Sequence, residues 1–281
     1  MNHCFLNGKI VSIDEAKVSV LDIGLMRGYG VYDGLAAING KPFRFADHWQ
    51  RFTNSAHALS LNIPITEEGC EKKVIELLEK SGLSNTRANV RMILTGGQTI
   101  SGIEYDFENP TFFITVEKWQ PLGQELYSQG AKLVTYRYKR EMPEHKTINY
   151  ITGVMLQSWK KEEGAIEVLY TYDGEVLECA TSNICIVKDG KLVTPAENVL
   201  GGITLKAAFE LASEMGLETE RRIIHESELR EADEVFITSS FKDIVPVVKI
   251  DDFEVGKGEG KGKVGYVAEK LNLKFAELLN M

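Results

Sequence analysis

The sequence has neither an excess of positive charge nor a long apolar run. Its 281 residues include 32 lysines and arginines against 41 aspartates and glutamates, a formal net charge of −9. Proteins that bind nucleic acids concentrate positive charge on one face, so this balance argues against a phosphate-backbone partner. No segment approaches the run of about 18 apolar residues that indicates a membrane-spanning helix. A small bound anion is still compatible, because it needs only local positive potential.

The four cysteines form no pattern typical of a metal site or a disulfide framework. None belongs to a Cys-x-x-Cys pair, and no histidines stand beside them at metal-ligand spacing. Cys185 lies in the apolar run 183–187, which predicts a buried free thiol. The first residues show no basic region followed by an apolar stretch. We therefore expect a reduced, soluble, cytoplasmic protein without a metal ion.

The sequence also lacks a repeat of fixed period and a phosphate-binding P-loop. The glycine- and lysine-rich segment 256–263 does not match the GxxxxGK[ST] spacing, and no serine or threonine follows its lysines. We interpret this segment as a solvated loop.

What the chain does have is a series of Asn-Gly and Asp-Gly pairs between short apolar strands. Such pairs supply the positive φ angles of type I′ hairpin turns. The pairs beginning at Asn7 and Asn39 predict two turns early in the chain. Those beginning at Asp173 and Asp189 predict an antiparallel meander over residues 167–194.

Apolar spacing predicts a helix over residues 45–61, and Thr66 is expected to cap a second helix that follows it. Segment 118–123 contains a proline and a glycine and is the best candidate for a linker. It divides the chain into a smaller part, residues 1–117, and a larger part, residues 124–281.

One lysine lies between a polar turn and the start of a helix. Residues 131–138 indicate a strand that Pro143 stops, and helical spacing begins at Tyr150. Lys146 therefore lies at an irregular strand-to-helix joint, a place where a rigid scaffold often holds catalytic side chains. A lone lysine is usually a solvated surface charge. The case for Lys146 as a functional residue therefore depends on motifs further along the chain.

Two hydroxyl-bearing turns are candidates for binding an anion. Residues 201–204, Gly-Gly-Ile-Thr, open a helix, where free N–H groups and the helix dipole favour a negative ligand. The alternative is an ordinary helix cap by Thr204. Residues 238–240, Thr-Ser-Ser, form a similar turn at the end of a strand. Together with Arg51, at the border of a helix's buried face, the two turns would suit one phosphate monoester.

Glu178 lies next to apolar residues, where a carboxylate is costly unless it is paired. A protonated pyridine nitrogen would offset that cost; the alternative is a solvent-facing glutamate in a hairpin. Arg27 and Arg91 are candidates for holding a substrate carboxylate, because the planar guanidinium matches it. The alternative for each arginine is a structural ion pair.

Taken together, Lys146-Thr147-Ile148-Asn149-Tyr150, Glu178 with the Thr-Ser-Asn-Ile of 181–184, and the Gly-Gly-Ile-Thr of 201–204 resemble the class IV aminotransferases. This family comprises the branched-chain and D-amino-acid enzymes that use pyridoxal 5′-phosphate. The resemblance covers nearly the whole chain. It implies an α+β or α/β two-domain fold, with a small N-terminal α/β domain and a larger, cofactor-binding C-terminal domain rich in antiparallel sheet. It also implies a homodimer.

The resemblance further implies a role for individual residues. Lys146 is similar to the catalytic lysine that bonds to the cofactor, Glu178 to the partner of the pyridine nitrogen, and Arg51 to the phosphate-binding arginine. The other cofactor contacts that it implies are Tyr150, Thr181, Ser182, Asn183, Gly202, Ile203, Thr204, Ser239 and Ser240.

The choice of amino acid is predicted from departures within the family. The sequence has Thr95-Gly96-Gly97 where the better-known D-amino-acid transaminases carry an arginine after the threonine. It has Tyr29 where branched-chain enzymes usually carry an acidic residue. Arg27, Tyr29 and Arg91 are the expected substrate-binding residues and resemble a less common group of D-amino-acid transaminases.

We therefore expect a D-amino-acid transaminase that uses 2-oxoglutarate or a similar 2-oxo acid in a ping-pong reaction. The alternatives are an L-branched-chain aminotransferase, an aminodeoxychorismate lyase, and a binding protein that keeps the fold without the cofactor.

Overall fold

The structure is a computed structural model that describes residues 3–280. The chain divides into two compact units, the first formed by Met1–Gln120 with His145–Tyr150 and the second by Pro121–Glu144 with Ile151–Met281. The sequence prediction placed residues 145–150 in the larger part of the chain, so this assignment differs from it. The reason is that the backbone of residues 146–148 is hydrogen-bonded to residues 30–32, a long-range pairing that the local sequence does not reveal.

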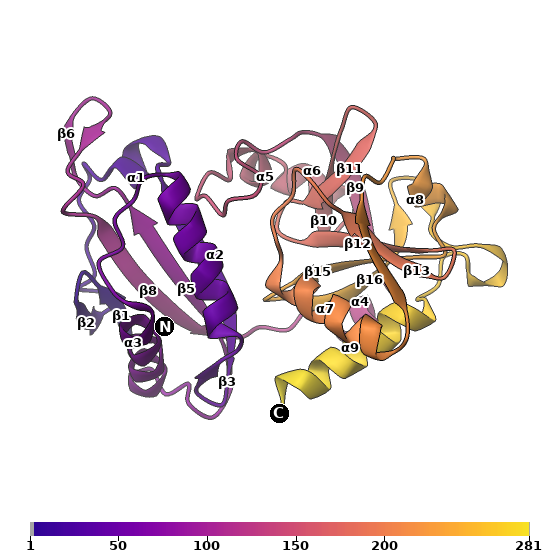
Figure 1. The fold of residues 1–281 in the computed structure, drawn as a ribbon, viewed down its shortest axis with the longest axis horizontal. Coiled ribbons are helices and arrows are strands. Elements are labelled where there is room, and N and C mark those ends of the chain that lie inside the picture. The colour runs from indigo at the N-terminus through magenta and orange to yellow at the C-terminus, as the bar shows by residue number, and fades with distance from the viewer. Residues whose placement is uncertain (1–2, 281) are drawn as a thin grey trace. The chain divides into compact units, whose positions relative to one another are not determined.

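The first unit is built on a six-stranded sheet in the order β2-β1-β8-β5-β3-β4, in which every neighbouring pair is antiparallel (Figure 1). Helices α2 and α3 pack against this sheet, and their apolar residues join its buried side chains in one core. The elements of this unit are β1 His3–Leu6, β2 Lys9–Ser12, α1 Ile23–Arg27, β3 Gly30–Ile38, β4 Lys41–Pro42, α2 Phe45–Ala58, α3 Glu67–Lys80, β5 Arg87–Thr95, β6 Thr99–Ser101, β7 Glu104–Tyr105 and β8 Thr111–Lys118.

Local sequence explains several of these elements. Asn7 and Gly8 have φ angles of 44° and 90°, so the predicted hairpin between β1 and β2 is confirmed. The Thr66 hydroxyl accepts a hydrogen bond from the Gly69 amide at 3.2 Å and caps α3 as predicted. The short helix α1 was not predicted; Asp22 caps it, and Gly28, at φ 68°, closes it.

The second unit contains a nine-stranded sheet in the order β11-β10-β9-β16-β15-β12-β13-β14, with β17 paired to β16. Helices α7 and α9 pack against strands of this sheet (Figure 1). The elements of this unit are α4 Gln124–Ser128, β9 Ala131–Arg137, α5 Ile151–Met155, α6 Gln157–Glu162, β10 Glu167–Tyr172, β11 Glu175–Cys179, β12 Asn183–Lys188, β13 Lys191–Pro195, α7 Ile203–Glu214, β14 Glu218–Arg222, α8 Glu228–Glu231, β15 Glu234–Ser239, β16 Asp243–Ile250, β17 Phe253–Glu254, the 3₁₀ turn η1 Gly258–Gly260 and α9 Tyr266–Leu279.

The predicted meander over residues 167–194 is only half right. The hairpins at Asp173 and Asp189 are confirmed, each with a positive φ angle at the aspartate. However, β11 and β12 do not pair, because β12 pairs with β15 on the other side of the sheet. The connection between β11 and β12, Ala180-Thr181-Ser182, contains no glycine or asparagine to close a tight type I′ turn.

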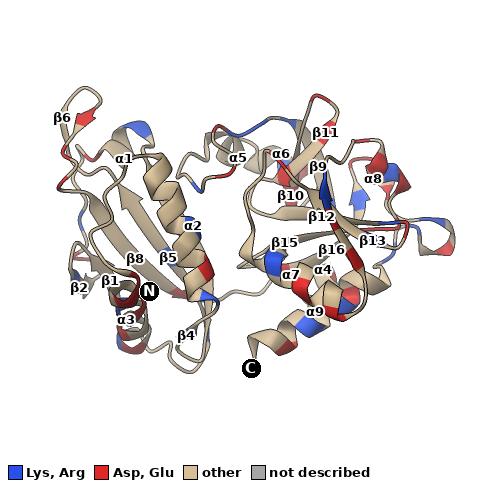
Figure 2. Cartoon of the chain, viewed as in Figure 1, with Lys and Arg blue, Asp and Glu red and all other residues tan. Residues whose placement is uncertain are grey.

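Three pairings in the second sheet are parallel: β9 with β10, β9 with β16, and β13 with β14. The sheet is therefore mixed but mainly antiparallel, and with the antiparallel first sheet it makes the fold α+β. Charged residues of both signs are interspersed on the helices, α9 among them (Figure 2). Among the described residues, no helix is both long enough and apolar enough to cross a membrane.

Candidate active site

Lys146 belongs to a segment that runs beside β3 in the first unit. The Tyr32 amide donates to the Lys146 carbonyl at 2.9 Å, and the Ile148 amide donates to the Gly30 carbonyl at 3.0 Å. The Lys146 amide in turn donates to the Ser55 hydroxyl at 3.0 Å. The backbone of this lysine is therefore fixed at both polar groups, which is what a precisely placed amine requires.

The half-buried side chain of Lys146 lies beside Tyr32, which in turn contacts Tyr150. Its Nζ atom lies 4.5 Å from the centre of the Tyr32 ring. The Tyr32 hydroxyl donates to the Tyr150 hydroxyl at 2.7 Å. Both tyrosines also interact electrostatically with Arg51. The structure thus brings together three residues predicted for the site, Lys146, Tyr150 and Arg51, and adds Tyr32.

Arg51 is held by a buried carboxylate that the sequence analysis did not single out. Its Nε and Nη2 atoms each donate to Asp33 at 2.8 Å, and the Asp33 side chain has no exposed surface. The Nδ1 atom of His48 lies 2.7 Å from the same carboxylate. Strand β3 supplies the acid, whereas α2 supplies the histidine and the arginine one turn apart. This bidentate pairing fixes the plane of the guanidinium.

The pKa values in this cluster follow from burial and charge. Burial alone would raise the pKa of Asp33, but Arg51 and then His48 outweigh it and hold the pKa well below its usual range. Burial lowers the pKa of His48, and Asp33 only partly opposes this, while the charges of Arg51 and Lys146 lower it further. His48 is therefore neutral near pH 7 and donates its Nδ1 proton to Asp33.

In the second unit, Glu178 lies at the end of β11 and is buried. Its Oε1 atom accepts from Arg140 Nε at 2.6 Å, and its Oε2 atom accepts from the Leu200 amide at 3.0 Å. The side chains of Arg140 and Glu178 are 9% and 7% exposed. The alternative of a solvent-facing glutamate is therefore wrong. Arg140 was missed because it lies in the charged run that follows β9, which indicates only a strand end.

The helix start at residues 201–204 has the features of an anion site. Gly202 is the N-cap of α7 and has no side chain with which to cap the first turn. The alternative of Thr204 as the cap is wrong, because Thr204 lies inside the helix and is buried. A Cβ on Gly202 would lie 2.0 Å from Asn183 Oδ1. Asn183 itself donates to the Leu200 carbonyl at 2.7 Å, so it fixes the loop that leads to the helix.

The second hydroxyl turn lies at the end of β15, next to Asn183 on β12. Thr238 is opposite Asn183 in the strand register. The Thr238 hydroxyl is buried and has no hydrogen-bond partner within residues 3–280. An unsatisfied buried hydroxyl costs about 1–3 kcal/mol, and a bound ligand that accepts its proton would remove this cost. With the uncapped turn of α7 and the close approach at Gly202, this donor set fits a phosphate group.

Thr181 and Ser182 have side-chain partners in the protein. Both hydroxyls donate to the buried carboxylate of Glu167, from Ser182 at 2.9 Å, and both accept from Lys242 Nζ. Neither Glu167 nor Lys242 was predicted. Glu167 begins an apolar strand, and a lone acid at that position is the one signal the sequence offers.

The predicted substrate residues each have partners of their own. Arg91 pairs with Glu117 on the adjacent strand, which is the structural ion pair considered as its alternative. The exposed Arg27 donates to the neighbouring Met26 carbonyl at 2.9 Å. The Tyr29 hydroxyl donates to the Leu59 carbonyl, and its ring packs against Tyr105. Their role in substrate binding stays a prediction.

Replacing the buried acid of the first unit tests whether it holds Arg51. Asp33→Asn leaves a buried guanidinium without its counter-charge, and we expect the free energy of unfolding to fall by about 3–5 kcal/mol at pH 7. Urea denaturation followed by circular dichroism measures this change. The matched control is Asp47→Asn, which breaks a more exposed 3.5 Å pair with Arg44 at the start of α2 and should cost at most about 1 kcal/mol.

The same pair of variants has a pH signature. Because the pKa of Asp33 is lowered in the folded protein, its stabilisation is complete above the unfolded pKa of about 3.9 and is lost as the pH falls toward the folded value. Asp33→Asn should therefore flatten the loss of stability below about pH 4. Equal acid dependence in Asp33→Asn and Asp47→Asn would contradict this assignment.

Comparison with known proteins places the chain in a family. The family model described as amino-transferase class IV matches residues 30–250. A putative branched-chain-amino-acid aminotransferase of Methanocaldococcus jannaschii is 34% identical over 98% of this chain and 95% of its own. A D-alanine aminotransferase of Listeria monocytogenes serotype 4b is 29% identical over 97% of this chain and 94% of its own.

Solved structures agree with this placement. The branched-chain amino acid aminotransferase of Escherichia coli matches with a TM-score of 0.90 at 26% identity, over 99% of this chain and 94% of that one. The T.th. branched-chain amino acid aminotransferase with pyridoxamine 5′-phosphate matches with a TM-score of 0.90 at 29% identity, with the same coverage. These matches confirm the fold that the sequence predicted. The chain therefore belongs to the class IV amino-transferases.

Proposed function

We propose that the protein is a pyridoxal-phosphate-dependent transaminase that moves an amino group between an amino acid and a 2-oxo acid, with D-amino acids as favoured donors. The observation that carries the proposal is the placement of Lys146, whose backbone is hydrogen-bonded at both groups and whose amine lies beside Tyr32. A solvated surface lysine needs no such fixation. The family membership supports the same reaction class.

In this proposal, Lys146, Arg51 and Glu178 have the cofactor-binding roles that the family resemblance implies. Pyridoxal phosphate, when bound, supplies an electron-accepting ring. Lys146 would attach it covalently and later move the proton of the substrate α-carbon as a general base. Glu178, which accepts hydrogen bonds from Arg140 and the Leu200 amide, would hold a proton on the ring nitrogen. Tyr32 and Tyr150 would orient the amine.

The phosphate group would be held by Arg51, by the first turn of α7 and by the turn at Ser239 and Ser240. The uncapped helix start, the close approach at Gly202 and the unsatisfied Thr238 hydroxyl support this assignment. Asn183 would act through the loop that it fixes. The cytoplasmic location expected from the sequence stays a prediction.

The choice between D- and L-amino acids divides the relatives. D-alanine aminotransferases from several bacteria are 28–29% identical to this chain, and the exposed guanidinium of Arg27, which donates to a neighbouring carbonyl, suits a carboxylate. The second candidate is an L-branched-chain aminotransferase, which the relative at 34% identity favours. The ion pair between Arg91 and Glu117 also favours the second candidate. It occupies one of the two arginines that were predicted to bind the carboxylate of a D-amino acid.

The first unit has several exposed apolar side chains that bear on the oligomeric state of the protein. Val20, Leu25, Ile100 and Ile103 are 77%, 70%, 70% and 76% exposed. The segments that carry them are joined by a hydrogen bond from the Thr99 amide to the Leu21 carbonyl at 2.9 Å. Large exposed apolar side chains on neighbouring segments are typical of protein interfaces. We propose that this surface is covered in a homodimer.

The role of Lys146 is tested by spectroscopy and labelling. The purified protein should absorb near the edge of the visible range, and Lys146→Ala should lose this band together with about 10³-fold or more of the activity. Borohydride reduction and peptide mapping should find the pyridoxyl group on Lys146. The matched control is Lys139→Ala, which removes an exposed lysine and should keep both. A pyridoxyl group found on any lysine other than Lys146 would overturn the proposal.

Donor preference is tested with a panel of D- and L-amino acids against 2-oxoglutarate, with chiral analysis of the glutamate formed. We expect D-alanine or another D-amino acid to be the best donor, with D-glutamate as product. Activity confined to L-leucine, L-isoleucine and L-valine would overturn the first candidate and support the second.

The homodimer is tested by sedimentation equilibrium. We expect twice the chain mass of 31.4 kDa for the native protein. Val20→Asp with Ile103→Asp should shift the equilibrium toward the monomer, because each places a charge on the apolar surface. A native protein that sediments as a monomer at micromolar concentration would contradict the proposal.

A further inference from the structure

A buried ion pair joins two turns of the second unit that carry predicted cofactor contacts, Thr181 with Ser182 and Ser239 with Ser240. Glu167, at the start of β10, is 2% exposed. Lys242 lies in the turn between β15 and β16, and its Nζ atom is 2.8 Å from Glu167 Oε1. The family resemblance assigned no role to either residue.

Lys242 uses all three of its ammonium protons inside this cluster. Besides Glu167, it donates to the Thr181 hydroxyl at 2.7 Å and to the Ser182 hydroxyl at 3.1 Å. Both hydroxyls donate their own protons to Glu167. A hydroxyl has only one proton to give, so neither Thr181 nor Ser182 can donate to a phosphate oxygen while the cluster is intact.

The backbone of Lys242 is fixed as well. Its amide donates to the Ser239 hydroxyl at 3.2 Å, and its carbonyl accepts from the Tyr127 hydroxyl at 3.1 Å. Because the Ser239 oxygen is an acceptor here, its proton points elsewhere and suits a phosphate oxygen. One residue therefore sets both the shape of the Ser239 turn and the orientation of its hydroxyl.

The buried carboxylate of Glu167 also needs the positive charge of Lys242 beside it. Burial would raise the pKa of Glu167, but Lys242 and the two hydroxyls outweigh burial and lower it. Without the ammonium group, a carboxylate would be left buried and uncompensated at the base of both turns.

On the basis of the proposed function, we propose that Lys242 is a positioning residue that presets the two turns for the phosphate group of the cofactor. It does so by tying Thr181 and Ser182 to Glu167 and by holding Ser239. Thr181 and Ser182 then act through the shape of their turn, not as phosphate donors. The effect of Lys242 is on the affinity for the phosphate group and not on the chemical step.

The experiment compares two ligands that differ only by the phosphate group, pyridoxal 5′-phosphate and pyridoxal, on the full-length apoprotein. Lys242→Met keeps an unbranched side chain, one atom shorter than that of lysine, and removes its charge. We expect it to raise the Kd for pyridoxal 5′-phosphate about tenfold, a loss typical of one charge-assisted contact network. The Kd for pyridoxal should change less than about twofold, and kcat at saturating cofactor should be nearly unchanged.

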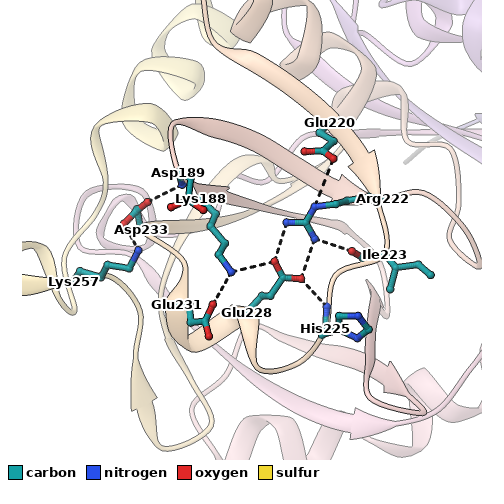
Figure 3. A network of polar contacts seen from close by, with 10 residues as sticks. All are labelled: Lys188, Asp189, Glu220, Arg222, Ile223, His225, Glu228, Glu231, Asp233 and Lys257. Atoms are coloured by element: carbon teal, nitrogen blue, oxygen red, sulfur yellow. Dashed lines mark hydrogen bonds and ion pairs between the residues drawn. The ribbon is translucent and has the colours of Figure 1, made fainter.

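The matched control is Lys188→Met. Lys188 is 18% exposed, close to the 20% of Lys242, and is held by Glu228 at 3.2 Å and Glu231 at 2.6 Å. Figure 3 shows that it belongs to a separate network with Arg222, none of whose members is predicted to contact the cofactor. This variant should leave the ratio of the two Kd values at the wild-type level, whatever it does to stability.

If Lys242→Met does not fold, the double variant Glu167→Gln with Lys242→Met removes both charges and leaves no unpaired carboxylate. We expect it to fold and to show the same selective loss of affinity for pyridoxal 5′-phosphate. An unchanged Kd ratio, or an equal loss for both ligands, would overturn the positioning role and leave the proposed function standing. A wild-type protein that binds neither ligand would overturn both.

Discussion

A buried carboxylate is costly unless charge or hydrogen bonds compensate it, and in three places in the two units a cation does so. Asp33 is compensated by Arg51, Glu178 by Arg140, and Glu167 by Lys242. Removing one partner of such a pair is far more costly than never burying the pair, so each pair fixes the segments that supply it. In each case the acid lies on a strand and the cation comes from a different segment. The ion pairs therefore act as cross-links between elements that carry predicted functional residues.

The loop before α7 shows how such a cross-link reaches the backbone. The Leu200 amide donates to Glu178, and the Leu200 carbonyl accepts from Asn183. Both polar groups of one residue are thus held by side chains that the sequence analysis had singled out. The loop that leads to Gly202 is therefore fixed at Leu200, and the helix begins at a residue that has no side chain to cap it. The acid and the helix start proposed to bind the phosphate group are in this way parts of one hydrogen-bonded assembly.

Local signals in the sequence predicted those structural features that depend on residues close together along the chain. The hairpin turns, the buried face of α2, the cap of α3 and the glycine at the start of α7 all follow from residue type at a fixed spacing. The cations that compensate the acids could not be predicted in this way. Arg140 and Glu178 are 38 residues apart, and Lys242 and Glu167 are 75 residues apart. The break in the meander has the same origin, because β12 pairs with β15 and the chain forms β13, α7, β14 and α8 between them.

The segment that carries Lys146 has a consequence for biosynthesis. Residues 145–150 complete the first unit, yet the chain must first make Pro121–Glu144, which belongs to the second. The Tyr32 amide and the Gly30 carbonyl pair with Lys146 and Ile148. The ribosome makes these two partners only after it has made the start of the other unit. Domains generally mature from the N-terminus as they emerge. Here the two units must instead mature in an interleaved order, and a gene fragment that stops at residue 120 would encode a scaffold without its amine.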